Sequence, residues 1–326
     1  MDTFFIFMGG MIMKNKKYIK NLKTYQPIYL NKIYLNENIT FSLEIEYKNA
    51  FFKDVSNFVK KTNEKEKTFL KNDYEHVTRN FLMGEQIGGE LTMGPLQDKF
   101  KDWKLLKDIM TNLKKLNAKI DFDCGGHVIV GMQSFKQTQS LINFFKLWAI
   151  FEDVIYQFTN GEYREYRGDV GGKDYAKKIA YYIYKNVDLI KQDDNVKGFF
   201  CELFNISFFN SLKRCHNKSI YKAFALSENP SLKYAFNNVI EFRCPNATLN
   251  EIVSQNNINF FCKLISLSND IDQNTLESLY KKEKRFGIDD DKKIFLLADL
   301  MYQNEIEKNN FLYQCYYKQK TLAKRF

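Results

Sequence analysis

The chain has 326 residues, a formal net charge of +10, 44% hydrophobic residues and 16% aromatic residues. At about 150 residues per domain, this length corresponds to one large or two small domains. The apolar and aromatic content excludes a disordered, collagen-like or low-complexity chain, because enough side chains are available to bury a core. Lys, Asn, Ile and Phe are all frequent, whereas Pro (4) and Trp (2) are rare. This usage is typical of coding bias along the whole chain, so the net charge is weak evidence for a nucleic-acid partner.

The first residues and the cysteines indicate the compartment. Thr3 to Met13 form an apolar run of 11 residues, which is far shorter than the roughly 20 residues needed to span a bilayer. The first lysines follow this run and no small-residue cleavage site comes after it, so it lacks the pattern of a secretory signal. The 6 cysteines contain no C-x-x-C pair, which argues against a zinc ribbon or a disulfide scaffold. We expect a cytoplasmic protein with free thiols and no membrane span.

The first predicted element is a half-buried strand over residues 39–49, in which apolar and polar side chains alternate. The apolar face carries Phe41, Leu43, Ile45 and Tyr47. The polar face carries Ser42, Glu44 and Glu46. Residues 53–78 are polar with apolar residues at helical spacing, and residues 88–95 indicate a short strand that ends in a turn.

Two apolar stripes predict helices in the middle of the chain. Residues 105–116 form an amphipathic helix, and the apolar spacing between residues 141 and 158 indicates a longer helix that ends near residue 160. Between them, residues 119–132 hold a strand, a Gly-Gly interruption and a second strand.

The last third of the chain begins with a tyrosine-rich helix over residues 174–189. A strand over residues 238–244 follows and ends at a proline. Thr248 and Glu251 then have the spacing of a capping box, which predicts a helix that starts there.

The strands are separated by helices and hairpin-like stretches, and no internal repeat of 20 to 50 residues is visible. This order predicts an α+β fold in which a curved antiparallel sheet is backed by helices. We divide the chain into an N-terminal extension (residues 1–38), a central domain (residues 39–268) and a charged helical C-terminal appendage (residues 269–326).

Two carboxylates on the first strand are the first candidates for chemistry. Glu44 and Glu46 are two residues apart and point to the same side, where their charges repel each other unless a cation lies between them. A divalent metal ion would supply this charge. For the pair alone, a solvated strand face is the more common explanation.

Three later segments strengthen the case for a site. Gly88-Gly-Glu90 places an acid beside two glycines, which permit a close backbone approach, and Cys124-Gly-Gly-His127 does the same for an imidazole. Asn238-Val-Ile-Glu-Phe-Arg243 places the carboxylate of Glu241 and the guanidinium of Arg243 on one strand face. If these strands are neighbours, four glutamates, one histidine and one arginine converge.

Four segments of the chain resemble motifs of the amidoligases, a family of carboxylate-amine ligases related to glutamine synthetase. Phe41-Ser-Leu-Glu-Ile-Glu46 is similar to the opening E-x-E strand of that family, and Gly89-Glu-Leu-Thr-Met-Gly-Pro95 to its G-x-E-L-x-S-P segment. Asp123-Cys-Gly-Gly-His-Val-Ile-Val-Gly131 is similar to the C-G-x-H-V-H-V-G segment, and Ile240-Glu-Phe-Arg243 to the T-x-E-F-R strand. Each motif is short, but four of them in the family's order are unlikely to arise by accident.

The resemblance implies a glutamine synthetase-like catalytic domain over residues 39–268. It implies that ATP activates a carboxylate as an acyl phosphate, that an amine displaces the phosphate, and that divalent metals neutralise the phosphates. The metal ligands that it implies are Glu44, Glu46, Glu90, His127 and Glu241. The catalytic residues that it implies are Arg243, Glu241 and Glu90, with Arg243 neutralising the transferring phosphoryl group. An oxygen-rich set with a single nitrogen ligand suits Mg²⁺ or Mn²⁺ better than zinc.

Two positions depart from the family pattern. Ile129 stands where the family has its second histidine, and Gly94 stands where the family has a serine before proline. Either change would alter nucleotide contacts or indicate decay of the site.

Two arginines after the long helix are further candidates for binding ATP. Arg164 and Arg167 could contact a phosphate or a substrate carboxylate, because a guanidinium offers two parallel donors. An exposed helix end with local ion pairs explains them equally well. The sequence contains neither a P-loop nor a G-x-G-x-x-G after a strand, so ATP would be held by metal and arginine contacts. Cys124 lies three residues before His127, but without an identifiable orienting partner a structural cysteine is favoured over a nucleophile.

Two other functions fit parts of the sequence. A catalytically inactive member of the family would act as a basic module that binds nucleic acid or a protein. A kinase-like enzyme would transfer the phosphoryl group to another acceptor. The ligase is the favoured function, and its expected partners are small-molecule or peptide carboxylates and amines rather than nucleic acid.

Overall fold

The structure is a computed structural model that describes residues 19–29, 35, 39–74, 80–82, 84–121, 124–160, 176–213, 223–226 and 238–317. These residues contain a seven-stranded sheet of order β2-β4-β1-β5-β7-β6, with β3 paired to β4. Neighbouring strands in this sheet run antiparallel. The strands are β1 (Phe41–Phe51), β2 (Leu70–Asp73), β3 (Asn80–Leu82), β4 (Glu85–Leu96), β5 (Val128–Gly131), β6 (Phe224–Leu226) and β7 (Val239–Phe242).

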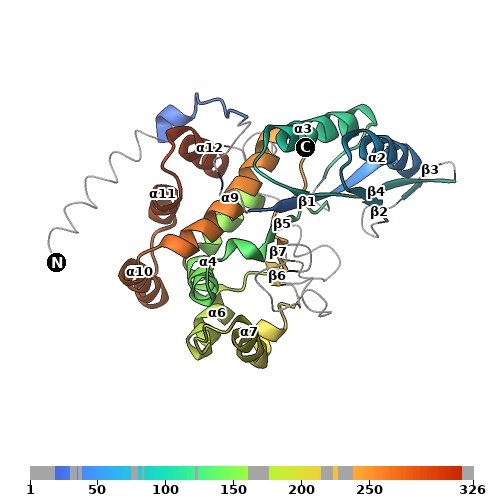
Figure 1. Ribbon diagram of the computed structural model, residues 1–326. Coiled ribbons are helices and arrows are strands. Elements are labelled where there is room, and N and C mark those ends of the chain that lie inside the picture. The colour runs from blue at the N-terminus through green and yellow to red at the C-terminus, as the bar shows by residue number, and fades with distance from the viewer. Residues whose placement is uncertain are drawn as a thin grey trace.

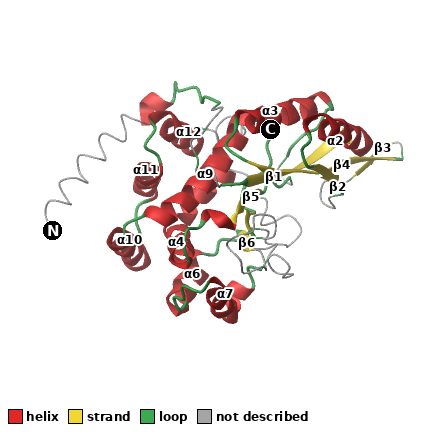
Figure 2. Cartoon of the chain, viewed as in Figure 1, coloured by secondary structure: helices red, strands yellow, loops and turns green. Residues whose placement is uncertain are grey.

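Helices pack against the sheet and, farther out, against one another (Figure 1), so they form an inner and an outer group. The inner group comprises α2 (Phe52–Glu66), α3 (Phe100–Lys115), α4 (Thr138–Asn160) and α9 (Glu251–Asp270). The others are α6 (Ala180–Asn186), α7 (Val196–Asn205), α8 (Ser207–Asn210), α10 (Gln273–Phe286), α11 (Asp290–Met301) and α12 (Glu305–Tyr316), with short 3₁₀ turns at Met132–Ser134 and Val187–Leu189. The predicted α+β fold, an antiparallel sheet backed by helices, is confirmed (Figure 2).

Aromatic side chains attach the helices to one face of the sheet. The ring of Phe41 on β1 stacks on Trp103 of α3, with 4.9 Å between the ring centroids. The ring of Phe242 on β7 lies 4.0 Å from Phe261 of α9 and 5.9 Å from Trp148 of α4. All five side chains are almost fully buried, and burying a side chain of this size stabilises the fold by about 1.5–3 kcal/mol. Helices α3, α4 and α9 therefore cover the apolar face of the sheet.

The segment after β1 differs from its prediction. Apolar residues lie at helical spacing over residues 53–78, but α2 ends at Glu66 and the chain turns at Lys67, which has a left-handed conformation (φ 49°). The chain then returns as β2, in which Leu70 is buried opposite Met93 of β4. A four-residue strand is too short to show a clear alternation of its own.

The outer helices α11 and α12 pack on α4 and α9 through buried amides as well as apolar side chains. Gln314 of α12 donates from Nε2 to the Phe158 carbonyl at 3.0 Å and to Asn257 Oδ1 at 2.9 Å. Asn259 of α9 donates to Glu307 of α12 at 3.1 Å. Because buried amides must find partners, these bonds hold α12 in one orientation against α9.

The start of α9 is predicted at nearly the right residue but with the wrong cap. Asn250, not Thr248, is the N-cap residue, and its side chain accepts from Ile252 N at 2.9 Å. Thr248 Oγ1 instead accepts from Asn250 N at 3.1 Å. In the described part of the chain, no helix is both long and apolar enough to cross a membrane.

Candidate active site

Strand β1 presents two glutamates on the face of the sheet opposite the one that packs on α3 and α9. Leu43 and Ile45 are buried in the core, so the alternation of a strand turns Glu44 and Glu46 to the other face. Glu46 lies directly opposite Glu90 of β4, and directly opposite residues of an antiparallel pair share a face. The acids of β1 and β4 therefore point to the same side.

Strands β5 and β7 add a histidine, a glutamate and an arginine to this face. The carbonyl of His127 accepts from Glu44 N at 2.9 Å, which places His127 beside Glu44. Ile129 pairs with Glu241, and residues two apart on a strand share a face. His127, Glu241 and Arg243 consequently lie on the face that carries Glu44.

Glu44, His127 and Glu241 form a buried cluster, called the triad below. His127 Nδ1 lies 2.9 Å from Glu44 Oε2 and 3.5 Å from Glu241 Oε1. The ligand atoms of the three residues all lie within 4.8 Å of one another, and the residues are 8%, 3% and 1% exposed, respectively. Two buried carboxylates at this separation repel each other unless positive charge lies between them. A protonated imidazole or a divalent cation would supply that charge.

Arg243 lies beside the triad on the same face. Its Nη1 donates to Glu241 Oε1, and its side chain is 14% exposed. The guanidinium therefore neutralises part of the charge of Glu241 and remains partly accessible to a ligand.

The glycines before His127 bring the backbone close to Glu46 and to the segment after β7. Gly125 N donates to Glu46 Oε2 at 2.6 Å. A Cβ on Gly126 would lie 2.7 Å from both Ala247 Cα and the Asn246 carbonyl oxygen, so only glycine fits without a shift. The Gly-Gly interruption thus positions both Glu46 and His127.

Glu90 is a predicted ligand that lies outside the triad. Its register partners are Glu46 on β1 and Asp73 on β2, and Lys71 Nζ contacts Asp73 Oδ2 at 2.8 Å. The five residues predicted to form one set of metal ligands are therefore arranged as two groups. One is the triad, and the other is a neighbouring pair, Glu46 and Glu90. The sequence reasoning missed Asp73 and Lys71, because their segment has a helical pattern.

The two departures from the family motifs lie on or next to this face. Ile129 is 7% exposed, and it pairs with Glu241 on β7 and with Ser42 on β1. Its chain neighbours Val128 and Val130 belong to the apolar core, whereas Ile129 does not. Gly94 has a φ of 133°, and a Cβ there would lie 2.8 Å from the Cβ and Oγ of Ser42. Ser42 therefore occupies the space that a serine at position 94 would need.

Other candidates are either disfavoured or outside the described residues. Cys124 is fully buried, and burial raises the pKa of its thiol to about 12, which disfavours a thiolate nucleophile. The arginines Arg164 and Arg167 lie in a part of the chain that the structure does not describe.

The donor chemistry of the triad fits a hard divalent cation. Carboxylate oxygens are the preferred protein ligands of Mg²⁺ and Mn²⁺, and the triad holds two carboxylates and a single imidazole. The acidic pair Glu46 and Glu90 beside it extends the negative potential along the face. This arrangement can bind cations, and through them and Arg243 it can bind phosphates.

Comparisons with known proteins bear on this site. A family model described as "Putative amidoligase enzyme" matches residues 29–265, which include the triad, Arg243 and the acidic pair. No curated protein matches the sequence. Among solved structures, the crystal structure of a bifunctional glutathione synthetase from Pasteurella multocida aligns with 11% sequence identity and a TM-score of 0.44, over 94% of this chain and 51% of that chain. This chain thus spans about half the length of that protein, and a likeness at this level carries no argument about the reaction.

Proposed function

This chain belongs to the amidoligase family, and from that premise we propose that it is an ATP-dependent ligase that joins a carboxylate to an amine. The observation that carries the proposal is the buried triad of Glu44, His127 and Glu241, with Arg243 in contact with Glu241. Burying two carboxylates together is costly unless positive charge lies beside them, and a bound divalent cation would supply that charge. Family membership and this arrangement support the same class of chemistry.

The proposed reaction has two steps. A carboxylate oxygen of the first substrate attacks the γ-phosphorus of ATP, which forms an acyl phosphate and releases ADP. The amine of the second substrate then attacks the acyl carbon, forms the C–N bond, expels inorganic phosphate and loses a proton. The carboxylate and amine are small molecules or peptides in this proposal, and the catalytic unit is residues 39–268, with residues 269–326 as a helical appendage.

We assign the triad as ligands of one divalent cation, Mg²⁺ or Mn²⁺, and Glu46 with Glu90 as ligands of a second. Such cations, when bound, neutralise the negative charge of the phosphates. Hydrogen bonding between the residues supports the assignment: Gly125 N orients the carboxylate of Glu46. The carbonyl of His127 is held by Glu44 N, which keeps the imidazole beside the carboxylate of Glu44.

Arg243 is assigned to the transferring phosphoryl group. A guanidinium offers paired donors that match phosphate oxygens, and such a group is most effective when it is already oriented before charge develops. Glu241 supplies that orientation through its hydrogen bond to Nη1. Arg164 and Arg167 are proposed as further contacts to ATP or to the carboxylate substrate.

We assign Glu90 as the base that accepts the proton lost by the amine. It is partly exposed, whereas Glu44, Glu46 and Glu241 are buried. A carboxylate that solvent reaches can accept a proton and release it again.

Cation and nucleotide binding test this proposal directly. We would measure Mn²⁺ binding by electron paramagnetic resonance and ATP binding by calorimetry, with and without Mg²⁺ or Mn²⁺. Glu241→Gln preserves the shape of the side chain and removes its charge, and we expect Mn²⁺ affinity to fall about 10- to 100-fold with a parallel loss of ATP binding. Glu64→Gln removes the same charge from an exposed position on α2 and should change both affinities less than about twofold.

Three outcomes would contradict the proposal. Unchanged Mn²⁺ and ATP binding in Glu241→Gln would refute the site assignment. If the wild-type protein binds no ATP with either metal but binds RNA with steep salt dependence, the inactive binding module is the better function. If ATP is consumed and a stable phosphoester forms in place of an amide and free phosphate, the enzyme is kinase-like.

A further inference from the structure

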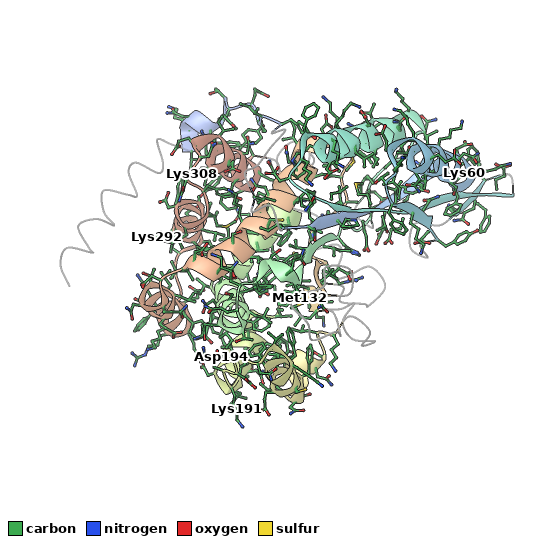
Figure 3. The ribbon with its side chains drawn as sticks, in the orientation of Figure 1. Lys60, Met132, Lys191, Asp194, Lys292 and Lys308 are labelled. Atoms are coloured by element: carbon green, nitrogen blue, oxygen red, sulfur yellow. The ribbon has the colours of Figure 1, made fainter. Side chains whose placement is uncertain are left out.

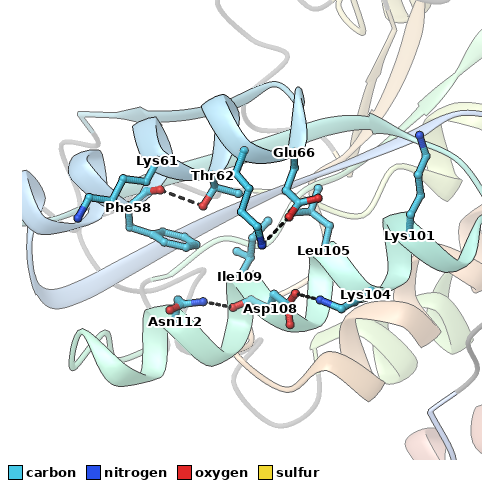
Figure 4. Close-up of a pocket in the computed structure, with 11 residues that line it drawn as sticks. Phe58, Lys61, Thr62, Glu66, Lys101, Lys104, Leu105, Asp108, Ile109 and Asn112 are labelled. Atoms are coloured by element: carbon cyan, nitrogen blue, oxygen red, sulfur yellow. Dashed lines mark hydrogen bonds and ion pairs between the residues drawn. The ribbon is translucent and has the colours of Figure 1, made fainter.

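A groove runs between α2 and α3, and it is separate from the proposed active site. Figure 4 shows the two helices with the side chains that line a cavity of about 260 Å³ between them. On α3 the lining extends from Lys101 to Asn112, which at 1.5 Å per residue is a length of about 16 Å. A second cavity of about 530 Å³ adjoins it, because both cavities are lined by Glu66, Lys101 and Leu105.

The floor of the groove is apolar and its rims are basic. Phe58 of α2 and Leu105 and Ile109 of α3 form the apolar part of the lining, and Phe58 and Leu105 remain partly exposed. Four lysines and two acids make up the charged part of the lining. The groove therefore combines an apolar strip with a net positive charge.

The acids on the rims are already paired with lysines of their own helices. Lys65 Nζ lies 3.0 Å from Glu66 Oε1, and Lys104 Nζ lies 2.5 Å from Asp108 Oδ2. Lys61 on α2 and Lys101 on α3 have no hydrogen-bonding or acidic partner among the described residues. One uncompensated cation thus lies on each rim, and Figure 4 places the two lysines toward different ends of the groove.

The groove lies on the far side of the sheet from the triad. Trp103 of α3 stacks on Phe41, whose side chain is on the opposite face of β1 from Glu44. A ligand in the groove therefore cannot reach the triad, and it cannot be the ATP of the proposed reaction. The groove instead lies between two helices on the other side of the sheet.

We propose that this groove binds an acidic amphipathic helix of a partner protein. The lining on α3, about 16 Å long, matches roughly three turns of a docked helix, and apolar side chains near the middle of that helix would cover Phe58 and Leu105 in the helix-in-groove mode. Two carboxylates on the docked helix would pair with Lys61 and Lys101. Because Lys61 and Lys101 lie toward different ends of the groove (Figure 4), a single small anion would not contact both.

The test uses a defined probe and a charge-matched control. Three fluorescein-labelled 16-residue helical peptides, with leucines at every third or fourth position and glutamates in three different registers, would be titrated with the full-length protein by anisotropy. Lys61→Gln/Lys101→Gln removes the two unpaired cations. Lys60→Gln/Lys115→Gln removes the same charge from exposed positions on the same two helices that do not line the groove (Figure 3 labels Lys60). Leu105→Ala removes part of the apolar floor.

We expect at least one peptide to bind the wild-type protein. We expect Lys61→Gln/Lys101→Gln to weaken binding about three- to tenfold, since each exposed ion pair contributes modestly. The control pair should change it less than twofold, and Leu105→Ala should weaken binding while leaving thermal unfolding cooperative. Equal weakening by both lysine pairs would show non-specific attraction and overturn the proposal. Failure of all three peptides, or binding of a U16 oligonucleotide or of anionic vesicles in their place, would overturn it as well. None of these substitutions touches the triad, so metal and ATP binding should be unchanged. The proposal for the groove and the proposal for the active site are therefore tested independently.

Discussion

The tight contact at Gly126 predicts that a single methyl group will damage both the fold and the site. In Gly126→Ala the new Cβ would lie 2.7 Å from Ala247 Cα, whereas ordinary contacts begin near 3.4 Å, so the two segments must separate by about 0.7 Å. The atoms in the way are backbone atoms and cannot rotate aside. The separation strains the hydrogen bonds from Ala247 N to the Cys124 carbonyl (3.0 Å) and from Gly126 N to the Pro245 carbonyl (3.1 Å).

The size of the effect follows from these contacts. Overpacking costs about 1–3 kcal/mol, and weakening two hydrogen bonds adds about 1 kcal/mol. The lower conformational freedom of the unfolded alanine variant offsets about 0.4–1 kcal/mol of this loss, which leaves a net loss of about 1–3.5 kcal/mol. At about 2.1 cal/mol/K of unfolding entropy per residue and 326 residues, Tm should fall by about 1.5–5 °C. Because His127 follows directly, Mn²⁺ affinity should fall about tenfold or more.

Calorimetry and Mn²⁺ titration of Gly126→Ala measure both effects, and Gly198→Ala is the control. The new Cβ at Gly198 would meet the flexible side chain of Asp193, and alanine is favoured over glycine inside a helix by about 1 kcal/mol. Tm should stay the same or rise in this control. If Gly126→Ala unfolds within about 1 °C of the wild type and retains its Mn²⁺ affinity, the close approach that places His127 is wrong.

Four other predictions concern separate parts of the molecule. Gly94→Ser should lower the free energy of unfolding by about 1–3 kcal/mol in urea titrations, because Gly94 has a φ of 133° and its new Cβ would meet β1 at 2.8 Å; an unchanged midpoint would contradict this. Lys293 is 3% exposed and contacts carboxylates of α4, α10 and α11. Lys293→Met should lower the free energy of unfolding by about 1–3 kcal/mol, which is less than the loss of a fully buried ion pair because its partners are partly exposed. Burial raises the pKa of Glu152 despite three hydrogen bonds to its carboxylate. The folded state then binds this proton more tightly than the unfolded state. The contribution of Glu152 to stability is therefore largest below its unfolded pKa of about 4.3 and is lost as pH rises through the higher folded pKa. The stability of the wild type relative to Glu152→Gln should fall from pH 4 to pH 7, and a rise would refute the direction. Iodoacetamide at pH 8 should modify exposed Cys201 and leave Cys124 unmodified in the native protein, as checked by peptide mass spectrometry. Early labelling of Cys124 would contradict this and make it a candidate nucleophile again.

Several elements of the fold were predictable because their signals are local. The alternation around Glu44 and Glu46 predicts β1 and the face on which each glutamate lies. The apolar stripe between residues 141 and 158 predicts α4 to its last turn. Periodicities of two and 3.6 residues depend only on which face is buried. The segment 53–78 shows the limit of this reasoning, since a weak helical pattern continues across the short strand β2.

The residues that form the site were recognisable as types, but their grouping was not. Glu44, His127 and Glu241 carry the right chemistry at separated positions, and motif order suggests that they converge. Their division into the triad and the pair of Glu46 with Glu90 depends on strand register. Asp73 joins that pair only because β2 lies beside β4.

The sequence alone therefore provides the helix and strand pattern, the polar face of β1 and the list of candidate ligands, since each depends on neighbours within a few residues. The folded structure determines the distances within the triad, the contact of Arg243 with Glu241, the close approach at Gly126 and the groove between α2 and α3. Each of these is a relation between segments that are tens of residues apart. Such relations are set by strand register and by packing against a shared core, where a shift of one residue would move every side chain to the other face.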